Sequence, residues 1–86
     1  MKAATRIIAI EAVEPFTVTC RFADETIKMV DFGNYLQQYK QHRLVAPLLN
    51  PNYFMAVSLD EIGGLVWTTG FDCSPLTAYE LGHPIA

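Results

Sequence analysis

Asp72 is the side chain of this 86-residue sequence that is best placed to bind a ligand. It follows Gly70, precedes the pair Ser74-Pro75 and lies close to the single tryptophan, Trp67. A carboxylate beside a buried aromatic ring is a common way to orient a polar ligand, so Asp72 and Trp67 could line a groove. The alternative is structural, because an aspartate in a turn often accepts hydrogen bonds from the amides of that turn.

Three other aspartates each have a structural explanation. Asp24 and Asp60 fall in predicted turns, where an aspartate side chain bonds the nearby backbone. Asp31 precedes a predicted helix, and its carboxylate can cap the free amides of a first helical turn. We keep Asp31 with Trp67 and Asp72 as candidate contacts for a ligand or a partner protein.

The remaining polar residues do not form a catalytic or metal-binding pattern. Nucleophilic catalysis needs a serine or cysteine beside a base, but Ser58 falls within a predicted strand and Ser74 is better used as a helix cap. His42 and His83 have no second ligand at metal-binding spacing, and a helix dipole sufficiently explains His42 near a helix end. We therefore expect no catalytic, cofactor-binding or metal-binding residue, and no enzyme.

Charge and cysteine content narrow the class of protein further. The net charge is −3 and the six lysines and arginines are scattered, so direct nucleic-acid binding is not expected. The apolar run before Glu11 is too short for a signal peptide or a membrane span, which predicts a cytoplasmic protein without membrane contact. Cys20 and Cys73 lie far apart without a paired motif and are expected to be ordinary buried thiols.

The apolar content is high for so short a chain. Hydrophobic residues make up 51% of the sequence and charged residues 17%, whereas about 25% is typical of soluble domains. A small domain has little interior in which to bury these side chains. We infer an exposed apolar patch, hence a homodimer or a protein partner; the alternative is a monomer with an ordinary, partly apolar surface.

The first half of the chain predicts three strands and a helix. Apolar residues on both faces of Thr5–Val13 indicate a strand covered on both sides, whereas Phe16–Phe22 alternates and should have one wet face. A turn leads into the third strand, Thr26–Phe32. Glu25 occupies the turn position that usually holds glycine, so it adopts a left-handed conformation or the loop is longer. A helix then runs to about Arg43, and either Asp31 or Asn34 can cap its start.

The second half predicts two more strands and a short helix. Alternation indicates a strand over Tyr53–Asp60, and a second strand over Leu65–Thr69 contains Trp67, which we expect to be a core or interface anchor. Ser74-Pro75 combines a capping side chain with proline at the first helical position, which predicts a helix over Pro75–Leu81.

These elements predict a single α+β domain over residues 1–86. Its mostly antiparallel sheet would have about five strands in the order β-β-β-α-β-β-α, with the helices on one face. The opposite face of the sheet is the predicted contact surface.

Part of this pattern resembles a known family, the bacterial domain of unknown function 2442. The similarity rests on Phe22-x-Asp24, Asp31, Leu48, Phe54 and Gly64-x-Val66-Trp67-x-x-Gly70-x-Asp72-x-x-Pro75, and it would cover Thr5 to Leu81. Two positions depart from the family pattern, Glu25 where a hairpin glycine is usual and Phe32-Gly33 where a leucine is usual.

The resemblance implies a small α+β domain. In some family members the domain is followed by a helix-turn-helix DNA-binding domain. Other members are encoded beside a second small protein in what resembles a toxin-antitoxin pair. No helix-turn-helix pattern is found in this sequence, so any regulation of transcription would act through a partner. We expect a protein-interaction module, either a homodimer or the smaller half of a two-protein system. The alternative is a small-ligand sensor or an enzyme with a groove near Trp67 and Asp72.

Overall fold

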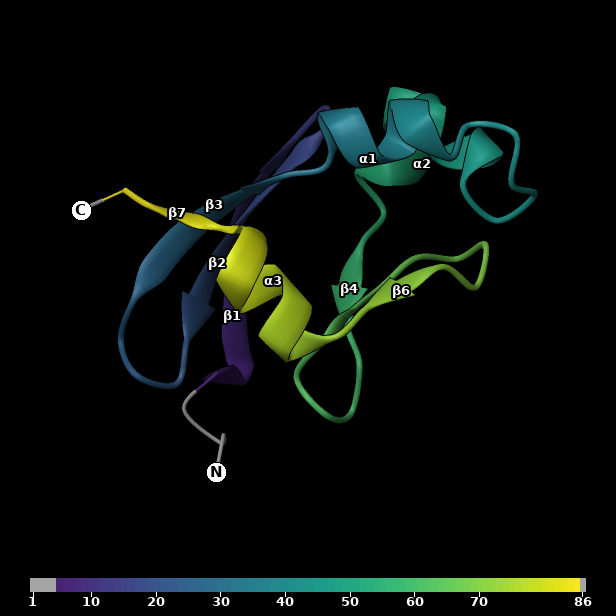
Figure 1. Cartoon of the computed structure of the whole chain (residues 1–86). Coiled ribbons are helices and arrows are strands. Elements are labelled where there is room, and N and C mark those ends of the chain that lie inside the picture. The colour runs from purple at the N-terminus through teal and green to yellow at the C-terminus, as the bar shows by residue number, and fades with distance from the viewer. Residues whose placement is uncertain (1–4, 86) are drawn as a thin grey trace.

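The long strands form one antiparallel sheet in the computed structural model, which describes residues 5–85 (Figure 1). The order in this sheet is β1-β2-β3-β7. Its strands are β1 (Ile7–Glu14), β2 (Thr17–Phe22), β3 (Ile27–Asp31) and β7 (His83–Pro84). Figure 1 shows α3 (Pro75–Leu81) lying across this sheet, with α1 (Gly33–Gln38) and α2 (Pro51–Phe54) at one end.

A second, smaller antiparallel sheet lies beside the first. Its order is β4-β5-β6, and its strands are β4 (Ser58–Leu59), β5 (Leu65–Val66) and β6 (Asp72–Cys73). A 3₁₀ turn, η2 (Ala46–Leu49), precedes α2. The prediction of an α+β fold with mostly antiparallel strands is confirmed. The strands are divided between two sheets, and the two-residue strands β6 and β7 were not predicted.

One core joins both sheets and all three α-helices. Val18, Cys20 and Phe22 alternate along β2 and are fully buried, which confirms the predicted one-sided strand. Buried side chains of the helices belong to the same core, namely Leu36 of α1, Phe54 of α2 and Ala78 of α3. The helices therefore cover one face of the large sheet, as predicted.

The prediction that the first strand is covered on both sides is wrong. Ile8 is 42% exposed, and Ala12 is also exposed. Two register shifts, between Ile7 and Ala9 and between Ile10 and Ala12, interrupt the pairing of β1 with β2. Because the helices and the small sheet pack on the other face, the second face of β1 has no layer above it in residues 5–85.

Of the two alternatives predicted for the turn between β2 and β3, the left-handed conformation of Glu25 is the one observed. Its φ is 74°, in the left-handed region, and its N–H donates to the carbonyl of Phe22 at 2.9 Å. Phe22 and Thr26 close the loop through a second backbone hydrogen bond of 2.8 Å. This pattern is typical of a hairpin loop in which a turn is followed by one left-handed residue, the position that favours glycine.

Two helices begin at a capping residue that is followed by proline, Asn50-Pro51 and Ser74-Pro75. Ser74 Oγ accepts from the Thr77 N–H at 3.2 Å, which confirms the predicted cap of α3. Asn50 Oδ1 accepts from the Asn52 N–H at 3.0 Å in the same way and begins α2. The strand predicted over Tyr53–Asp60 is therefore wrong in its first half, because its alternating residues begin in a helix; only Ser58–Leu59 forms a strand.

The first helix is shorter than predicted. It ends at Gln38, and turns follow where the helix was expected to continue to Arg43. Phe32 is its N-cap without a side-chain bond, so neither Asp31 nor Asn34 occupies the capping position. Asp31 nevertheless accepts the Gly33 N–H at 2.8 Å and so satisfies one amide of the first turn.

Candidate functional site

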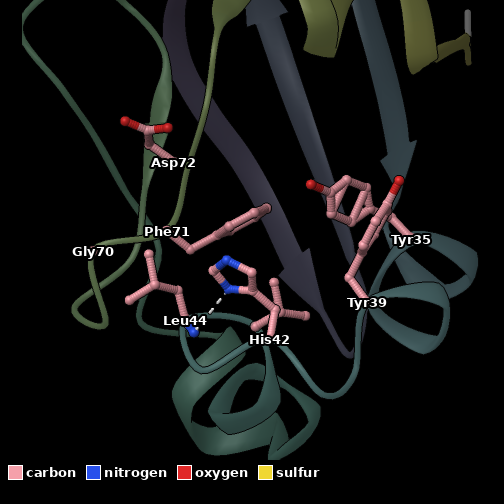
Figure 2. Close-up of a pocket in the computed structure, with 8 residues that line it drawn as sticks. Tyr35, Tyr39, His42, Leu44, Gly70, Phe71 and Asp72 are labelled. Carbon is pink, nitrogen blue, oxygen red and sulfur yellow. Dashed lines mark hydrogen bonds between the residues drawn. The ribbon is translucent and has the colours of Figure 1, made fainter.

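A pocket of about 430 Å³ opens beside α1 and is walled mainly by aromatic rings. Figure 2 shows the rings of Phe71 and His42 on one side and those of Tyr35 and Tyr39 on the other, with Asp72 beyond Phe71 and its carboxylate pointing away from the tyrosines. The tyrosines come from α1 and its C-cap, whereas Phe71 and Asp72 come from the segment that enters β6. The lining residues are Tyr35, Tyr39, His42, Leu44, Val45, Gly70, Phe71 and Asp72.

The two tyrosines are set on one side of α1 by their spacing of one helical turn. Their ring centroids lie 4.7 Å apart, and the Tyr35 ring lies 5.6 Å from that of Phe71. Tyr35 is 37% and Tyr39 45% exposed, while Leu36 points into the core. Burial raises the pKa of Tyr35, and the nearby Tyr39 and Cys73 raise it further. Leu36 therefore belongs to the core, whereas the two tyrosines belong to the pocket.

A tight turn aims Phe71 into the pocket. Trp67 and Phe71 are joined by a backbone hydrogen bond of 2.9 Å, and Gly70 between them has a φ of +99°, which only glycine adopts readily. Thr69 Oγ1 donates to the Leu44 carbonyl at 2.9 Å. The turn that presents Phe71 is thus tied to the loop that holds His42 and Leu44.

Trp67 lies beneath the pocket and does not line it. It is 2% exposed, and its indole Nε1–H donates to the Phe54 carbonyl at 2.8 Å. Its ring packs on Phe71 with centroids 5.3 Å apart. Trp67 is therefore a core anchor that supports the pocket through Phe71.

Asp72 is exposed and lines the pocket, and in Figure 2 its carboxylate points away from the rings. Its backbone pairs with Val66 in the small sheet. Within residues 5–85 the carboxylate accepts no hydrogen bond and forms no ion pair, so the expected bonding to the amides of its own turn is not seen.

A second pocket of about 200 Å³ adjoins the first and extends toward α3. Tyr35, Phe71 and Asp72 line both pockets, and Thr77 and Leu81 of α3 line the second. We call the two pockets together the aromatic groove. It runs from the loop after α1, past Asp72, to the last turn of α3.

His42 and Asp31 have different roles from those expected. Because α1 ends at Gln38, a helix dipole does not explain His42; it lies in the following loop, where Nδ1 accepts the Leu44 N–H at 3.2 Å. Asp31 is exposed, bonds the Gly33 amide and does not line the groove. Of the three predicted contacts, Asp72 lines the groove, Trp67 supports it and Asp31 lies outside it.

The open face of the large sheet, the predicted contact surface, is mixed in character. Arg21 and Glu11 form an ion pair of 2.7 Å there, and register places Thr19 beside Met29. Met29 is 38% exposed. Charged and small polar side chains thus accompany the apolar ones on this face, whereas three partly exposed rings, those of Tyr35, Tyr39 and Phe71, lie together in the groove.

The described part of the chain offers no group of side chains for a metal ion and no reactive thiol. Residues 5–85 contain no group of three or more His, Cys, Asp or Glu side chains that could hold a metal ion. Burial raises the pKa of Cys20 to about 12 and that of Cys73 to about 11, so neither thiol is a nucleophile near neutral pH. No helix among these residues is long and apolar enough to span a bilayer.

Comparisons of the chain with protein-family models, with curated proteins and with solved structures found no match. The resemblance to the bacterial domain of unknown function 2442 therefore stays a prediction.

Proposed function

We propose that this protein is a cytoplasmic protein-interaction module whose contact surface is the aromatic groove. It acts as a homodimer or as the smaller half of a two-protein system, and any effect on nucleic acid passes through its partner. The observation that carries the proposal is the exposure of large apolar side chains around one depression. Tyr35, Tyr39 and Leu81 are each more than a third exposed, and Phe71 is half-buried between them.

The rings of Tyr35, Tyr39 and Phe71 are partly exposed to water. Aromatic side chains carry much of the binding energy at protein interfaces, because they bury a large area and lose little conformational freedom. The groove also combines a rigid floor, Trp67, with walls from α1 and β6. A partner side chain that entered it would displace water from rings that are already held in place.

The second candidate is a small-ligand sensor or an enzyme. The observation that favours it is the volume of the larger pocket, about 430 Å³, which falls within the range of about 300–1,000 Å³ found for small-molecule sites. The groove offers Asp72, His42 and two tyrosines as polar groups. This candidate would be favoured if the groove bound a small molecule and the chain captured no partner protein.

The test compares two exposed tyrosines. Tagged wild type, Tyr39→Ser and Tyr53→Ser are used to capture proteins from the native host's lysate, and light scattering gives the mass of each purified chain. Tyr39 lines the groove and is 45% exposed, whereas Tyr53, on α2, is 52% exposed and lies outside it. We expect one stoichiometric partner or a homodimer with wild type and Tyr53→Ser, and its loss with Tyr39→Ser. A monomeric wild type that captures nothing would contradict the proposal.

A further inference from the structure

We infer that the aromatic groove holds an extended segment of the partner protein, which adds a strand to the outer edge of β6 and places apolar side chains in the two pockets. This inference rests on the proposed function and adds the form of the contact. It follows from the register of the small sheet, which leaves the main chain of Asp72 unpaired where the two pockets meet.

The pairing of β5 with β6 shows where the main-chain groups of Asp72 point. In an antiparallel pair, residues that exchange hydrogen bonds alternate with residues that do not. The Trp67 N–H donates to the Phe71 carbonyl at 2.9 Å, so the next pair, Val66 and Asp72, is one without hydrogen bonds. The N–H and C=O of Asp72 therefore point away from β5.

The pairing of β5 with β4 leads to the same direction. The Asp60 N–H donates to the Gly64 carbonyl at 3.0 Å, so the pair two positions further along, Ser58 and Val66, is again a hydrogen-bonded one. Val66 thus directs its main-chain groups toward β4. Because β6 is the last strand of this sheet, the main-chain groups of Asp72 lie at an open edge, and no other part of the described chain bonds to them.

The two pockets meet at this open position. Asp72 lines both of them, together with Tyr35 and Phe71. In Figure 2 the carboxylate of Asp72 points away from the rings, whereas the side chain before it, Phe71, belongs to the groove. In an added strand, the side chain opposite Asp72 would point away from the groove as well, and its two neighbours would point toward it. Alternate side chains of the added strand can therefore enter the two pockets.

An extended segment suits this edge better than a helix does. The N–H and C=O groups within a helix are bonded inside the helix and cannot pair with Asp72. Addition of a strand to a sheet edge is a recurring mode of peptide recognition, in which main-chain bonds give affinity and side-chain pockets give specificity. Besides the rings, the side chains of Leu44, Val45 and Leu81 line the pockets, so apolar side chains fit them. The expected occupant is an extended segment with apolar side chains at alternate positions.

The test uses a short peptide and a matched control. The peptide, acetyl-Ser-Leu-Ser-Leu-Ser-amide, has leucines at alternate positions. The control has an N-methyl group on the central serine, which removes one N–H and leaves every side chain in place. Both are titrated into the full chain and followed by amide NMR.

We expect saturable shifts at residues 35–45, 69–73 and 77–81 with the unmethylated peptide, and slower hydrogen exchange of the Asp72 amide in the complex. The control should bind about fivefold more weakly, or worse, because one hydrogen bond contributes about 1 kcal/mol. Equal binding of the two peptides, or no saturable shift, would overturn the inference.

Two substitutions at one position test the main chain of the protein. Asp72→Pro removes the outward N–H, and proline is tolerated at such a position of an edge strand. Asp72→Ala removes the carboxylate and keeps the N–H. We expect the peptide to bind about fivefold more weakly to Asp72→Pro and as to wild type to Asp72→Ala, and equal affinities of the two variants would contradict the inference. Circular dichroism shows whether both variants are folded; if Asp72→Pro is not, the N-methyl control decides.

Competition separates this inference from the proposed function. An excess of the peptide should release the captured partner or dissociate the homodimer, and the N-methyl control should do so less. If Tyr39→Ser abolishes association but the peptide neither binds nor competes, the inference fails and the proposed function stands. If wild type is monomeric and captures nothing, the proposed function fails, and with it the assignment of the segment to a partner protein, even if the peptide binds.

Discussion

The hydroxyl of Tyr79 donates a 2.6 Å hydrogen bond to Asp24 Oδ2 across a separation of 55 positions in the sequence. This bond fastens α3 to the β2–β3 turn. Asp24 also accepts the Thr26 N–H at 2.9 Å, the Tyr79 ring packs edge-on against Phe22, and Lys28 Nζ lies 3.5 Å from the Tyr79 ring centroid. Asp24 was expected to be a turn residue; it is one, and it also connects the turn to the last helix.

The first prediction concerns pH. The hydrogen bond from Tyr79, with further bonds from Thr26, lowers the pKa of Asp24. A carboxyl whose pKa is lower in the folded than in the unfolded state stabilises the fold above its unfolded pKa, and this contribution is lost as the pH falls through the folded pKa. Tyr79→Phe should therefore lower the free energy of unfolding at pH 7 and have progressively less effect below pH 4, as measured by urea unfolding at several pH values.

The control for this experiment is Tyr53→Phe, which removes the hydroxyl of an exposed tyrosine on α2. It should leave the pH profile of stability unchanged. Parallel profiles for wild type and Tyr79→Phe, separated by the same free energy at every pH, would show that the hydrogen bond to Asp24 is not the cause.

The second prediction concerns the left-handed residue of the same turn. A left-handed conformation costs a residue with a Cβ about 1–2 kcal/mol. Substitution by glycine removes this cost, but glycine has greater freedom in the unfolded chain, and this freedom offsets part of the gain. Because Glu25 has a φ of 74°, Glu25→Gly should raise the free energy of unfolding by about 0.5–1 kcal/mol. Glu25→Ala keeps the strain and should give no gain in thermal unfolding. Equal stabilities of the two variants would contradict this explanation.

Where local signals were sufficient, the sequence predicted the structure well. Ser74-Pro75 marked the start of α3, and the alternation over Phe16–Phe22 predicted the buried face of β2. The Asn50-Pro51 pair carries the same capping chemistry as Ser74-Pro75, and in the structure it prevails over the alternation that follows it. A proline at the first helical position together with an asparagine cap was the stronger signal, because both act directly on the first turn.

The groove was only partly predictable. Asp72 was identified from its neighbours in the sequence, and the spacing of Tyr35 and Tyr39 could have indicated a ring pair on one side of a short helix. That Phe71 completes the wall depends on the turn at Gly70 and on the contact of Thr69 with Leu44. Such contacts between distant segments leave no periodic signal. The same holds for β7, which pairs with β3 through two residues only.

The third prediction concerns the thiols. The pKa of Cys20 is raised to about 12 and that of Cys73 to about 11, mainly by burial, whereas an unfolded cysteine has a pKa of about 8.5. Their burial as neutral thiols therefore stabilises the fold fully below about pH 8.5, and this contribution is lost as the pH rises through the folded pKa values. The urea midpoint should fall between pH 8 and pH 10, and it should fall less steeply for Cys20→Ala.

Thiol labelling provides an independent measurement. At pH 8, Ellman's reagent should react with both cysteines only as fast as the protein unfolds, since Cys20 is 0% and Cys73 7% exposed. Addition of urea should accelerate both reactions. Rapid labelling of either cysteine in the absence of urea would show that its burial is not maintained in solution.

The last prediction separates support of the groove from contact with its occupant. Trp67→Phe removes the buried hydrogen bond to the Phe54 carbonyl and leaves space among the surrounding rings. Loss of a buried hydrogen-bond partner costs about 1–3 kcal/mol, and a cavity adds to it, so unfolding followed by circular dichroism should show a loss of about 2–4 kcal/mol. Phe71→Leu, at a half-buried position, should cost less stability.

Binding should follow the opposite order. Phe71 contributes a ring to the wall of the groove, whereas Trp67 contributes none, so Phe71→Leu should weaken association with the partner protein or of the homodimer more than Trp67→Phe does while both proteins are folded. Capture from the host's lysate and light scattering of each purified chain give the extent of association in each case. If Trp67→Phe weakened association as much as Phe71→Leu, the occupant would have to contact Trp67 directly.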